Sequence, residues 1–529
     1  MSVATASAID DLTAVLKQIC GPEHVISDPN ECAVFSQDIW QKGETADLIV
    51  APADSEETAK LVEAASTRGV AVYPRGGGMS YTNGYTPATP GGVIIDFTRM
   101  NRVVEINAED MYVTVEAGCT WQDLHIALKP LGLRTPFWGP LSGISSTIGG
   151  GLSQNNAFFG AGTYGPTSDS VTSLKVVLAD GSIVETGTAS TRGAKPFWRH
   201  YGPDLTGVFM GDAGALGFKV EATFRLIQAP SHEDWASFEF ATLDGVAKAA
   251  ADMARTGIAC ELFGFDPNLT KVRLKRASLA ADVKTLKNVV AGQGSLLKGV
   301  KEGAKIALAG RSFMADAAYS LHAIVEGRSK AGVADGMAEL KSIAEKHGAR
   351  EIENSIPKII RANPFTPLNN MLGPEGERWA PVHGIISMSD GPACWARIDA
   401  LFETLRDELD AHNILTGYLV TTLSTNGYLI EPVFIWPEEL FDIHERSVEK
   451  DFLARLPRHK SNPDATALVA KVRSAVVDVF AEFGGAHFQI GKTYPYRESR
   501  TAAAWALVEA LKSHVDAKRV INPGALGLK

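Results

Sequence analysis

Residues Pro74 to Thr86 read PRGGGMSYTNGYT, a glycine-rich stretch that directly follows the apolar run VAVY. Glycine loses more backbone entropy on folding than any other residue, so a cluster of glycines needs a reason. A second cluster, GISSTIGGGLSQNN, spans residues 143–156. Neither cluster fits the dinucleotide fingerprint GxGxxG, because Tyr81 and Gln154 stand where the third glycine should be, and neither contains a Walker lysine.

Two separate glycine loops can nevertheless share one pyrophosphate. Successive backbone N–H groups that point into a concavity bind an anion without any lysine. The hydroxyl groups of Ser80, Ser145, Ser146 and Thr147 can add further donors. Taken singly, each loop is equally consistent with a structural turn, but the pair favours a phosphate-binding site.

Composition narrows the class of protein. The chain has 529 residues and a formal net charge of −10, which disfavours general nucleic-acid binding. Its 5 cysteines are scattered without a CxxC pair, so neither a disulfide scaffold nor a zinc site is indicated. The N-terminal stretch lacks the pattern of a signal peptide, and no apolar run approaches the roughly 20 residues of a spanning helix. We expect a soluble, cytoplasmic protein without a membrane span.

The pattern of helix and strand signals changes near residue 228. Before it, a small α/β module with helices over 8–21 and 55–69 precedes a more β-rich region. APSHED (229–234) has the composition of a boundary, and strands and helices alternate after it, which predicts a second α+β unit with an antiparallel sheet. The stretch from Thr270 to Arg311 is predicted to be helical. Its basic residues form either a solvated helix face or a docking surface for a membrane or an electron acceptor; they are Lys298, Lys301, Lys305 and Arg311.

Five segments, in order, resemble the FAD-binding segments of the vanillyl-alcohol oxidase/p-cresol methylhydroxylase superfamily. They are YPRGGGMSYTNGYT, VIIDFTRMNRVVEINAEDMYVTVEAGCTWQDLHIAL, SSTIGGGLSQNNAFFGAGTYGPTSDSVTSLKVVLADGS, DLTGVFMGDAGALGFKVEATFRL and the closing VDAKRVINPGALG. The match covers about residues 45–227 and the last fifteen residues. It implies an α+β fold in which a two-part FAD-binding domain, 1–227 with the C-terminal segment 485–529, carries an inserted cap domain, 228–484, built on an antiparallel sheet.

By matching position, the resemblance also implies which residues hold FAD. One side of the pyrophosphate is held by Arg75, Gly76, Gly77, Gly78, Met79 and Ser80, and the other by Pro140, Ser146, Thr147, Gly149, Gly150, Asn156 and Gly165. Gly214, Gly217 and Phe218 border the flavin, and Asn522 and Pro523 close over it.

The departures from the family pattern concern the bond to FAD. Many members carry a histidine in the first glycine loop that bonds covalently to the flavin, and this chain has Met79 there. A second branch uses a cap histidine after a Trp-x-Pro stretch. In WAPVHGIISMS the matching position is Ile385, with His383 two residues earlier on the same strand face. We therefore expect FAD to be held non-covalently, while a bond to His383 stays open.

Other departures concern the substrate. The Tyr-Arg pair that binds phenolates corresponds to His487-Phe488, and the aspartate of the quinone-methide chemistry corresponds to Pro166, which disfavours a phenol oxidase of that mechanism. The D-lactate and D-2-hydroxyglutarate dehydrogenase branch binds a metal through several histidines. Here the matching segments keep only His487 and Glu431, so we predict no metal.

In the implied chemistry, flavin N5 accepts a hydride while the protein positions the C–H bond and takes the hydroxyl proton. The candidate catalytic residues are His487, Lys492 and Glu431. His487 is the preferred base, with a core histidine as the alternative, and Glu431 lies in an apolar run where a carboxylate is usually paired or functional. The candidate substrate-binding residues are Arg378, His383, Tyr494, Tyr496 and Arg497, each with an ordinary surface or core role as the alternative.

The sequence thus predicts an FAD-dependent oxidase or dehydrogenase that turns C–OH into C=O. Bulky aromatic alcohols are the first substrate class, and D-2-hydroxy acids such as lactate or glycolate are the second. O2 or a protein or quinone is the expected electron acceptor, and a homodimer is one open assembly. An electron-transfer subunit and a catalytically inactive flavoprotein are the competing interpretations.

Overall fold

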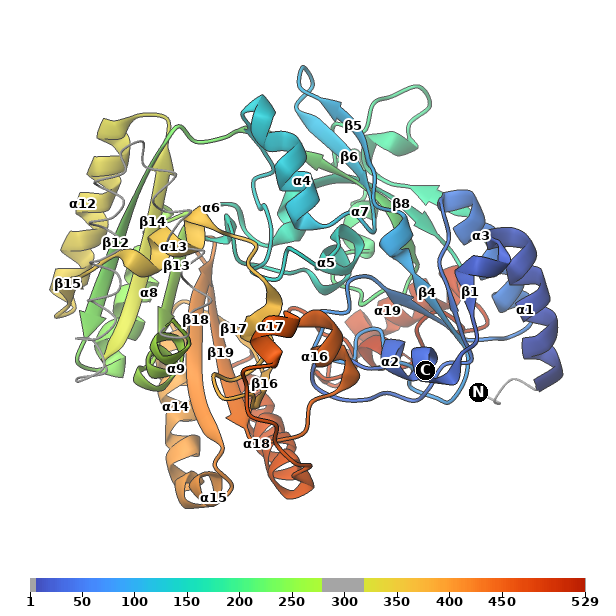
Figure 1. The fold of residues 1–529 in the computed structure, drawn as a ribbon. Helices are drawn as coiled ribbons and strands as arrows, with labels where there is room; N and C mark the ends of the chain where they lie inside the picture. Colours follow the sequence, from blue (N-terminus) through green and yellow to red (C-terminus); the bar gives the residue numbers. More distant parts are fainter. Residues whose placement is uncertain (1–5, 278–317, 529) are drawn as a thin grey trace.

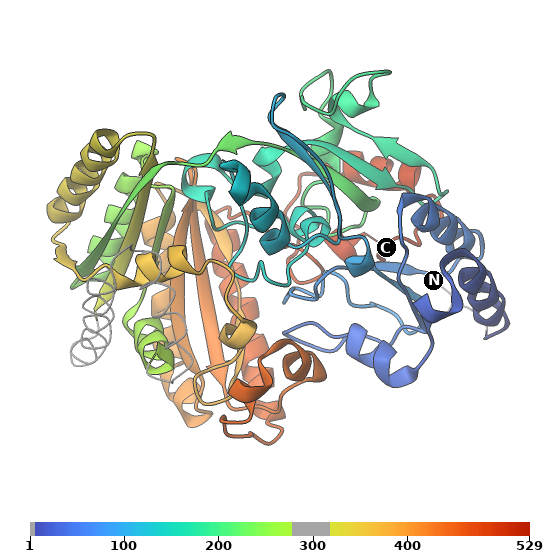
Figure 2. The same cartoon turned by 45° about the horizontal axis from the view of Figure 1, so that its top comes forward.

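The computed structural model describes residues 6–277 and 318–528 of the chain, which form two parts lying side by side. The N-terminal part includes the helices α1 and α3, and the cap contains the long strands and helices on the other side (Figures 1 and 2). The basic residues Lys298, Lys301, Lys305 and Arg311 lie outside the described residues.

The first sheet of the N-terminal part is small and mostly parallel. Its strand order is β1-β2-β4-β3, with β1 (Val25–Ile26) antiparallel to β2 and the other neighbours parallel. The remaining bounds are β2 Leu48–Val50, β4 Val93–Asp96 and β3 Val72–Arg75. Asp54 caps the start of α3 (Ser55–Thr67), because its side chain accepts a hydrogen bond from the Glu57 N–H. Helix α1 (Ala6–Cys20) packs against α3.

The second sheet of the N-terminal part is antiparallel, in the order β5-β6-β10-β8-β9. Its strands are β5 Val103–Asn107, β6 Tyr112–Glu116, β10 Phe218–Arg225, β8 Val171–Val177 and β9 Ile183–Glu185. A two-stranded ribbon joins β7 (Leu133–Arg134) and β11 (Ile227–Gln228). The short helices of this part are α2 Pro29–Phe35, α4 Trp121–Leu128, α5 Ile148–Gln154, α6 Ala161–Tyr164 and α7 Leu205–Val208.

The C-terminal segment returns to the first sheet. The Val72 N–H donates to the Val520 carbonyl at 2.9 Å, and the Asn522 N–H donates to the Val72 carbonyl at 2.8 Å. Residues 520–522 therefore run beside β3, directly below the first glycine loop. Helix α19 (Ala502–Val515) precedes this contact.

The cap is built on one large antiparallel sheet, as predicted. Its order is β15-β12-β14-β13-β18-β19-β16, with β17 also pairing with β19. The strands are β12 His232–Phe240, β13 Glu261–Phe265, β14 Tyr319–Gly327, β15 Arg350–Ile352, β16 Arg378–Pro381, β17 Gly384–Ser387, β18 Leu415–Leu423 and β19 Gly427–Trp436.

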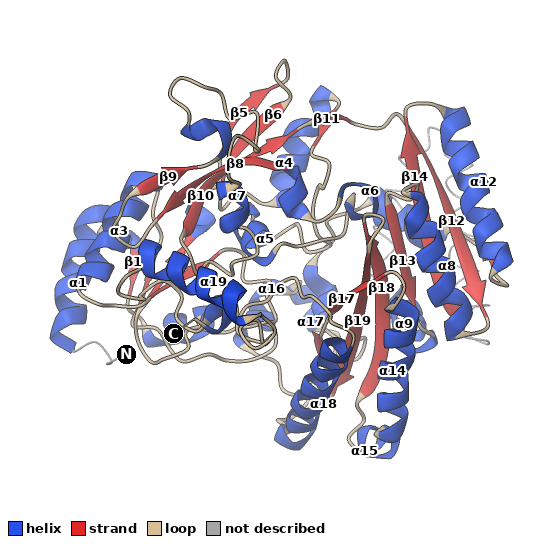
Figure 3. Ribbon diagram, turned by 180° about the vertical axis from the view of Figure 1, so that it is seen from behind, coloured by secondary structure: helices blue, strands red, loops and turns tan. Residues whose placement is uncertain are grey.

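Helices cover one face of the cap sheet, as the view from behind shows (Figure 3). The four that pack together there are α8 Leu243–Thr256, α12 Lys330–Lys346, α14 Gly391–Thr404 and α18 Pro463–Glu482. The other cap helices are α9 Pro267–Ala277, α13 Ser355–Ala362, α15 Arg406–Ala411, α16 Asp442–Ser447 and α17 Lys450–Leu453. Within residues 6–277 and 318–528, no helix has the length and apolar character that crossing a bilayer requires.

Strand β19 shows how the cap sheet separates two cores. Ile430 and Phe434 pack into the core under the helices, while Leu429 and Val433 join the core that faces the N-terminal part. Side chains alternate between the two faces of a strand. Glu431 therefore points toward the N-terminal part, into the space between the two parts of the molecule.

Candidate active site

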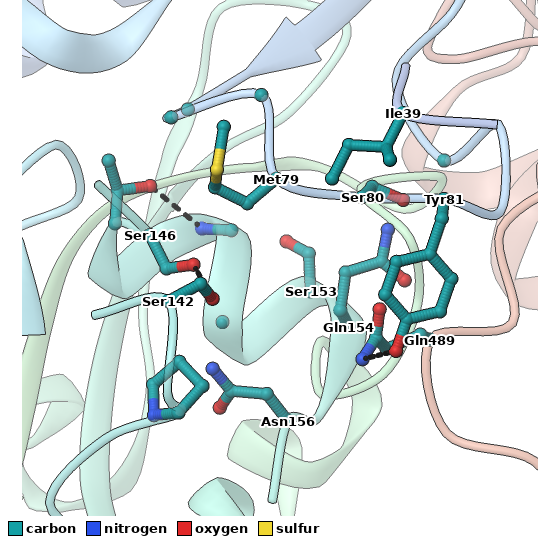
Figure 4. Close-up of a pocket in the computed structure, with 18 of the residues that line it drawn as sticks. Ile39, Met79, Ser80, Tyr81, Ser142, Ser146, Ser153, Gln154, Asn156 and Gln489 are labelled. Atoms are coloured by element: carbon teal, nitrogen blue, oxygen red, sulfur yellow. Dashed lines mark hydrogen bonds between the residues drawn. The ribbon is translucent and has the colours of Figure 1, made fainter. Parts of the chain in front are cut away.

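A deep cavity separates the N-terminal part from the cap sheet, with an empty volume of about 1930 Å³ including its open mouth. The glycine loop after β3, the loop 140–147 and helix α5 form one side of it. The other side comes from cap strands β16, β18 and β19 and from residues 366–371. Figure 4 shows side chains of the glycine loop, the loop 140–147 and helix α5 around the cavity, together with Gln489.

The two glycine loops lie in direct contact. A Cβ atom added at Gly77 would stand 1.8 Å from the Ser145 carbonyl oxygen, and one at Gly76 would stand 2.2 Å from Thr147 Oγ1. Such distances leave no room for a side chain, so glycine is required where the loops meet. Thr147 in turn caps α5 by accepting a hydrogen bond from the Gly150 N–H at 3.3 Å.

The first loop offers hydrogen-bond donors that other parts of the described chain do not use. Within residues 6–277 and 318–528, none of the backbone N–H groups of 76–80 donates a hydrogen bond to another protein group. Consecutive free N–H groups at a cavity wall form an anion-binding concavity. The N-terminus of α5, on the opposite loop, also favours negative charge.

Three side chains at the cavity wall carry buried polar atoms without a protein partner. They are Arg75 Nε, Gln154 Oε1 and Asn156 Oδ1. The Arg75 guanidinium lies over the Phe35 ring at 4.1 Å, which fixes its charge beside the glycine loop. Buried polar atoms are normally hydrogen-bonded. Arg75 Nε can donate to an anionic group, while the two amide oxygens can accept from hydroxyl or N–H groups, so the set fits a ligand that carries both kinds of group, such as FAD.

Most of the predicted cofactor residues line this cavity. Those at the wall are Arg75, Gly76, Gly77, Gly78, Met79, Ser80, Pro140, Ser146, Thr147, Gly149, Gly150, Asn156, Gly214, Gly217 and Phe218. Gly165 and Asn522 do not line it. Gly165 has a positive φ of 77° and stands against the Asp169 carboxylate, so its role is in the turn after α6.

Asn522 supports the cavity wall from behind. Its Nδ2 donates to the Gly84 carbonyl at 2.7 Å and to the Ala213 carbonyl at 2.6 Å, and both of these residues line the cavity. Its Oδ1 accepts from Lys492 Nζ at 2.7 Å. The C-terminal segment thus ties two wall loops together.

Lys492, a predicted catalytic residue, takes part in this support and does not line the cavity. Its ammonium also donates to the carbonyls of Asn83 at 3.2 Å and Thr86 at 3.0 Å. Burial lowers the pKa of Lys492 to about 7. The structure therefore assigns this lysine to the loop contacts.

Glu431 is the one carboxylate among the described residues that line the cavity. Its Oε2 lies 3.5 Å from the Tyr81 hydroxyl, which belongs to the first glycine loop. Gln489 Nε2 donates to the same hydroxyl at 3.1 Å (Figure 4). Burial, followed by the neighbouring Glu431 charge, raises the pKa of Tyr81 well above its usual value, so its hydroxyl stays protonated.

Apart from these polar groups, much of the cap side of the wall near Glu431 is apolar. Its apolar residues include Trp379, Leu419, Val433, Ile435 and Phe488. The Trp379 ring meets the Tyr81 ring edge to face, with centroids 5.7 Å apart. Together these side chains form an aromatic and aliphatic pocket with a single acid at its wall.

The predicted base His487 and the predicted substrate residue His383 lie behind this wall and do not line the cavity. The His383 ring is fully buried; its Nε2 donates to the Phe488 carbonyl at 2.5 Å, and its Nδ1 accepts from the Tyr494 hydroxyl at 3.1 Å. Burial lowers the pKa of His383 to about 3, so the ring is neutral. His487 Nδ1 donates to the His383 carbonyl at 2.8 Å, and its ring stacks on Tyr494. Burial lowers the pKa of His487 as well.

The remaining predicted substrate residues also lie away from the cavity wall. The Arg378 guanidinium stacks on the Phe441 ring at 3.9 Å and donates to the Trp40 carbonyl, so it fastens the cap to the N-terminal part. Burial lowers the pKa of Arg378 to about 10. Tyr496 and Arg497 interact with Arg500 and Trp505 respectively, around the start of α19.

The residues that sequence reasoning missed are Tyr81, Gln154 and Gln489. Tyr81 and Gln154 stand in the two glycine-rich stretches, and Gln489 lies two residues after His487. The sequence does not show in which direction these side chains point, because a loop has no periodic pattern from which to infer which side chain enters a cavity. Among residues 6–277 and 318–528, no group of three or more His, Cys, Asp or Glu side chains is arranged to hold a metal ion.

Comparison with known proteins supports the interpretation of the loops. Residues 46–187 match the model of an FAD binding domain. The fold of 99% of the chain superimposes on 98% of p-cresol methylhydroxylase with a TM-score of 0.74 at 16% sequence identity. The chain therefore contains an FAD binding domain and shares its overall fold with p-cresol methylhydroxylase. The predicted resemblance, fold class and FAD cofactor are thereby confirmed.

Further similarities vary in extent. The 4-ethylphenol oxidase from Gulosibacter chungangensis covers 99% of this chain, and the chain covers 98% of it, with a TM-score of 0.69 at 15% identity. In sequence, the glycolate oxidase subunit GlcD of Bacillus subtilis is 31% identical over 46% of this chain and 50% of its own length. The mitochondrial cytochrome-type D-lactate dehydrogenase of Arabidopsis thaliana is 36% identical over 40% of this chain and 36% of its own length. The matched region thus spans half or less of these curated relatives.

Proposed function

We propose that the chain is an FAD-dependent oxidoreductase that converts the C–OH group of a bulky aromatic alcohol into C=O. The observation that carries the proposal is the position of Glu431. Glu431 is 9% exposed, lies beside the Tyr81 hydroxyl in a pocket with a largely apolar cap side, and faces the two loops that fit FAD. A carboxylate is rarely buried in apolar surroundings unless it is paired or functional.

The chemistry of alcohol oxidation defines what FAD and the protein must each supply. When bound, FAD supplies the acceptor for the hydride that leaves the alcohol carbon. The protein must hold the alcohol and take the proton from its hydroxyl group. Glu431 supplies the acceptor for this proton. Tyr81, whose pKa is raised, supplies a hydroxyl that stays protonated and available for hydrogen bonding beside the carboxylate.

The non-covalent hold on FAD rests on the chain's own residues. The N–H groups of 76–80 and the N-terminus of α5 would meet the pyrophosphate, while Gln154 and Asn156 supply the unpartnered polar atoms further along the cavity. Met79 lines the cavity at the position where a histidine would form a bond.

The pocket wall favours an apolar substrate body. Trp379 and Phe488 provide aromatic surfaces beside Glu431, and Leu419, Val433 and Ile435 complete the wall. Aromatic side chains bind aromatic rings through offset or edge-to-face contacts. An aromatic alcohol fits this lining with its hydroxyl group at Glu431.

The names of two sequence relatives favour a 2-hydroxy acid instead, since glycolate and D-lactate both carry a carboxylate. Such a substrate needs a cation near the reacting carbon. Among the described residues that line the cavity, the cationic side chains are Arg75 and Lys219. Both come from the N-terminal part, and Lys219 Nζ is already paired with Asp212 at 2.6 Å. The cap side of the pocket thus supports the aromatic alcohol over the hydroxy acid.

The test is anaerobic mixing of the FAD-loaded protein with a panel of aromatic alcohols, D-lactate and glycolate. We expect the flavin absorbance to bleach with aromatic alcohols and not with the hydroxy acids. Bleaching by D-lactate or glycolate alone would transfer the assignment to hydroxy acids. No bleaching by any of them would favour an electron-transfer subunit or an inactive flavoprotein. Admission of air then distinguishes an oxidase from a dehydrogenase that needs a protein or quinone acceptor.

Glu431→Gln tests the proton acceptor directly. The amide keeps the size of the side chain but cannot take a proton, so flavin reduction should slow by about 10²- to 10⁴-fold with FAD still bound. Glu239→Gln is the matched control, because Glu239 stands on cap strand β12 and pairs with Arg350 at 3.0 Å, away from the cavity wall. Equal reduction rates in the two variants would rule out Glu431 as the base.

A further inference from the structure

Gln489 has a backbone conformation that side chains rarely adopt. Its φ is 50°, in the left-handed region that glycine occupies without strain. Residues held in such conformations cluster at functional sites, where the surrounding structure imposes them. Here the Gln489 N–H donates to the Gln154 carbonyl at 2.6 Å, and the Lys492 N–H donates to the Thr82 carbonyl at 2.9 Å. The loop is thus fixed against the glycine loop and the end of α5.

The strained backbone sends the Gln489 side chain into the cavity beside Tyr81 (Figure 4). Its Nε2 donates to the Tyr81 hydroxyl at 3.1 Å. A phenol has one hydrogen to donate, so the hydroxyl that accepts from Gln489 directs its own hydrogen to another acceptor. The Glu431 Oε2 atom, 3.5 Å from this hydroxyl, is such an acceptor.

We propose that Gln489 is a positioning residue, which orients the Tyr81 hydroxyl toward Glu431 and thereby holds the carboxylate in the direction from which it meets the substrate hydroxyl. The inference rests on the proposed function, since it assigns a task within the same site. Gln489 acts through Tyr81, so its removal changes the orientation of the Glu431 carboxylate. Glu431 itself, the proton acceptor, is still present in such a variant.

The choice of residue at position 489 supports this role. Glycine would fit the left-handed backbone without strain. If residue 489 served only the conformation of the loop, its replacement by glycine would stabilise the protein. Gln489 keeps the strain and adds a donor at the length that reaches Tyr81. The side chain therefore has a task that the loop geometry alone does not explain.

The test compares Gln489→Gly and Gln489→Asn with the wild-type holoprotein. Glycine relieves the strain and deletes the donor, while asparagine keeps an amide and tolerates the left-handed region but is one methylene shorter. For both variants we expect unchanged FAD loading, read from the visible spectrum, and a thermal midpoint equal to or above that of the wild type. The rate constant of anaerobic flavin reduction should fall by about 10- to 100-fold, with little change in the substrate concentration at half-saturation.

A double-variant cycle distinguishes positioning through Tyr81 from a direct role. Tyr81→Phe should slow flavin reduction by a similar factor, and Tyr81→Phe combined with Gln489→Gly should be no slower than Tyr81→Phe alone. Multiplication of the two factors in the double variant would overturn the inference, as would a Gln489→Gly variant that reduces its flavin at the wild-type rate. A wild-type flavin that no alcohol reduces would overturn the proposed function and this inference with it.

Discussion

Arg134 on β7 and Glu326 on β14 form a buried two-pronged ion pair that joins the N-terminal part to the cap. The Nη1–Oε2 distance is 2.9 Å and the Nη2–Oε1 distance is 2.5 Å, and both side chains are less than one tenth exposed. Glu326 also accepts from Arg361 at 2.6 Å, and Arg361 contacts Glu261 at 3.1 Å. The cap is therefore fastened to the N-terminal part by charges that water hardly reaches.

Replacement of Glu326 by glutamine should strongly destabilise the fold. Arg134 would keep its charge in a buried position without its carboxylate, and breaking such a pair costs about 3–5 kcal/mol. We expect a clear fall in the midpoint of thermal unfolding at pH 7. A double variant, Arg134→Met with Glu326→Leu, should recover part of the loss because it removes both charges. A single variant as stable as the wild type would contradict a role for this pair in fastening the cap.

The same pair predicts how the stability difference depends on pH. The two arginines hold the pKa of Glu326 down, from 4.5 to about 2, against the opposing effect of burial. A carboxyl group whose pKa is lower in the folded than in the unfolded state stabilises the fold fully at a pH above the unfolded-state pKa. This stabilisation is lost as the pH falls to the folded-state pKa. The stability difference between the wild type and Glu326→Gln should therefore shrink between about pH 4.5 and pH 2. Unfolding midpoints of both proteins across this range measure it.

Gly77→Ala should prevent FAD binding while leaving most of the fold intact. Its new Cβ would stand 1.8 Å from the Ser145 carbonyl oxygen, so the two loops must separate. We expect a colourless protein after purification and at least a 100-fold weaker FAD affinity in titrations followed by flavin fluorescence, since loop displacement removes several hydrogen bonds of about 1 kcal/mol each. Gly332→Ala on α12 is the control, because its Cβ would meet only Ser329 Oγ at 3.2 Å. A yellow Gly77→Ala protein would contradict the two-loop contact.

The glycine loops show how much of the site the sequence predicts. Runs of glycine such as 76–78 and 149–150 are costly in backbone entropy, so they occur where a side chain would not fit. The pattern therefore indicates that the backbone closely approaches another backbone segment or a ligand. The cap strand with Glu431 is likewise predictable, because strand periodicity gives the side chain a face once its neighbours are known. In both cases local chemistry restricts the possible structures.

The segment 487–497 shows where prediction fails. His487, Lys492 and Tyr494 have chemistry suited to catalysis, yet their side chains bond to backbone groups and, for Tyr494, to the His383 ring behind the wall. Their direction depends on loop conformations, among them the positive φ of Gln489, which no periodic pattern predicts. The residues of this segment that line the cavity are Phe488 and Gln489, neither of which was proposed as a site residue from the sequence.

Asn522→Asp should weaken FAD binding without touching the cofactor site directly. The aspartate keeps the shape and still accepts from Lys492, but it cannot donate to the Gly84 and Ala213 carbonyls. Leaving buried carbonyls unsatisfied costs about 1–3 kcal/mol each, so the wall loops that they belong to should loosen. We expect a lower thermal midpoint and at least a 10-fold higher dissociation constant for FAD. An unchanged dissociation constant would show that the wall loops keep their shape without Asn522.

The state of His383 predicts that FAD is released intact when the protein is denatured. A covalent bond would need a free ring nitrogen at the cavity, but Nε2 is bonded to the Phe488 carbonyl and Nδ1 to the Tyr494 hydroxyl. The ring is neutral at every physiological pH, because burial lowers its pKa to about 3. After acid precipitation, all flavin absorbance should therefore appear in the supernatant, and a denaturing gel should show no fluorescent protein band. Fluorescence that stays with the protein, and disappears in a His383→Gln variant, would mean that the ring turns away from Phe488 to bind the flavin.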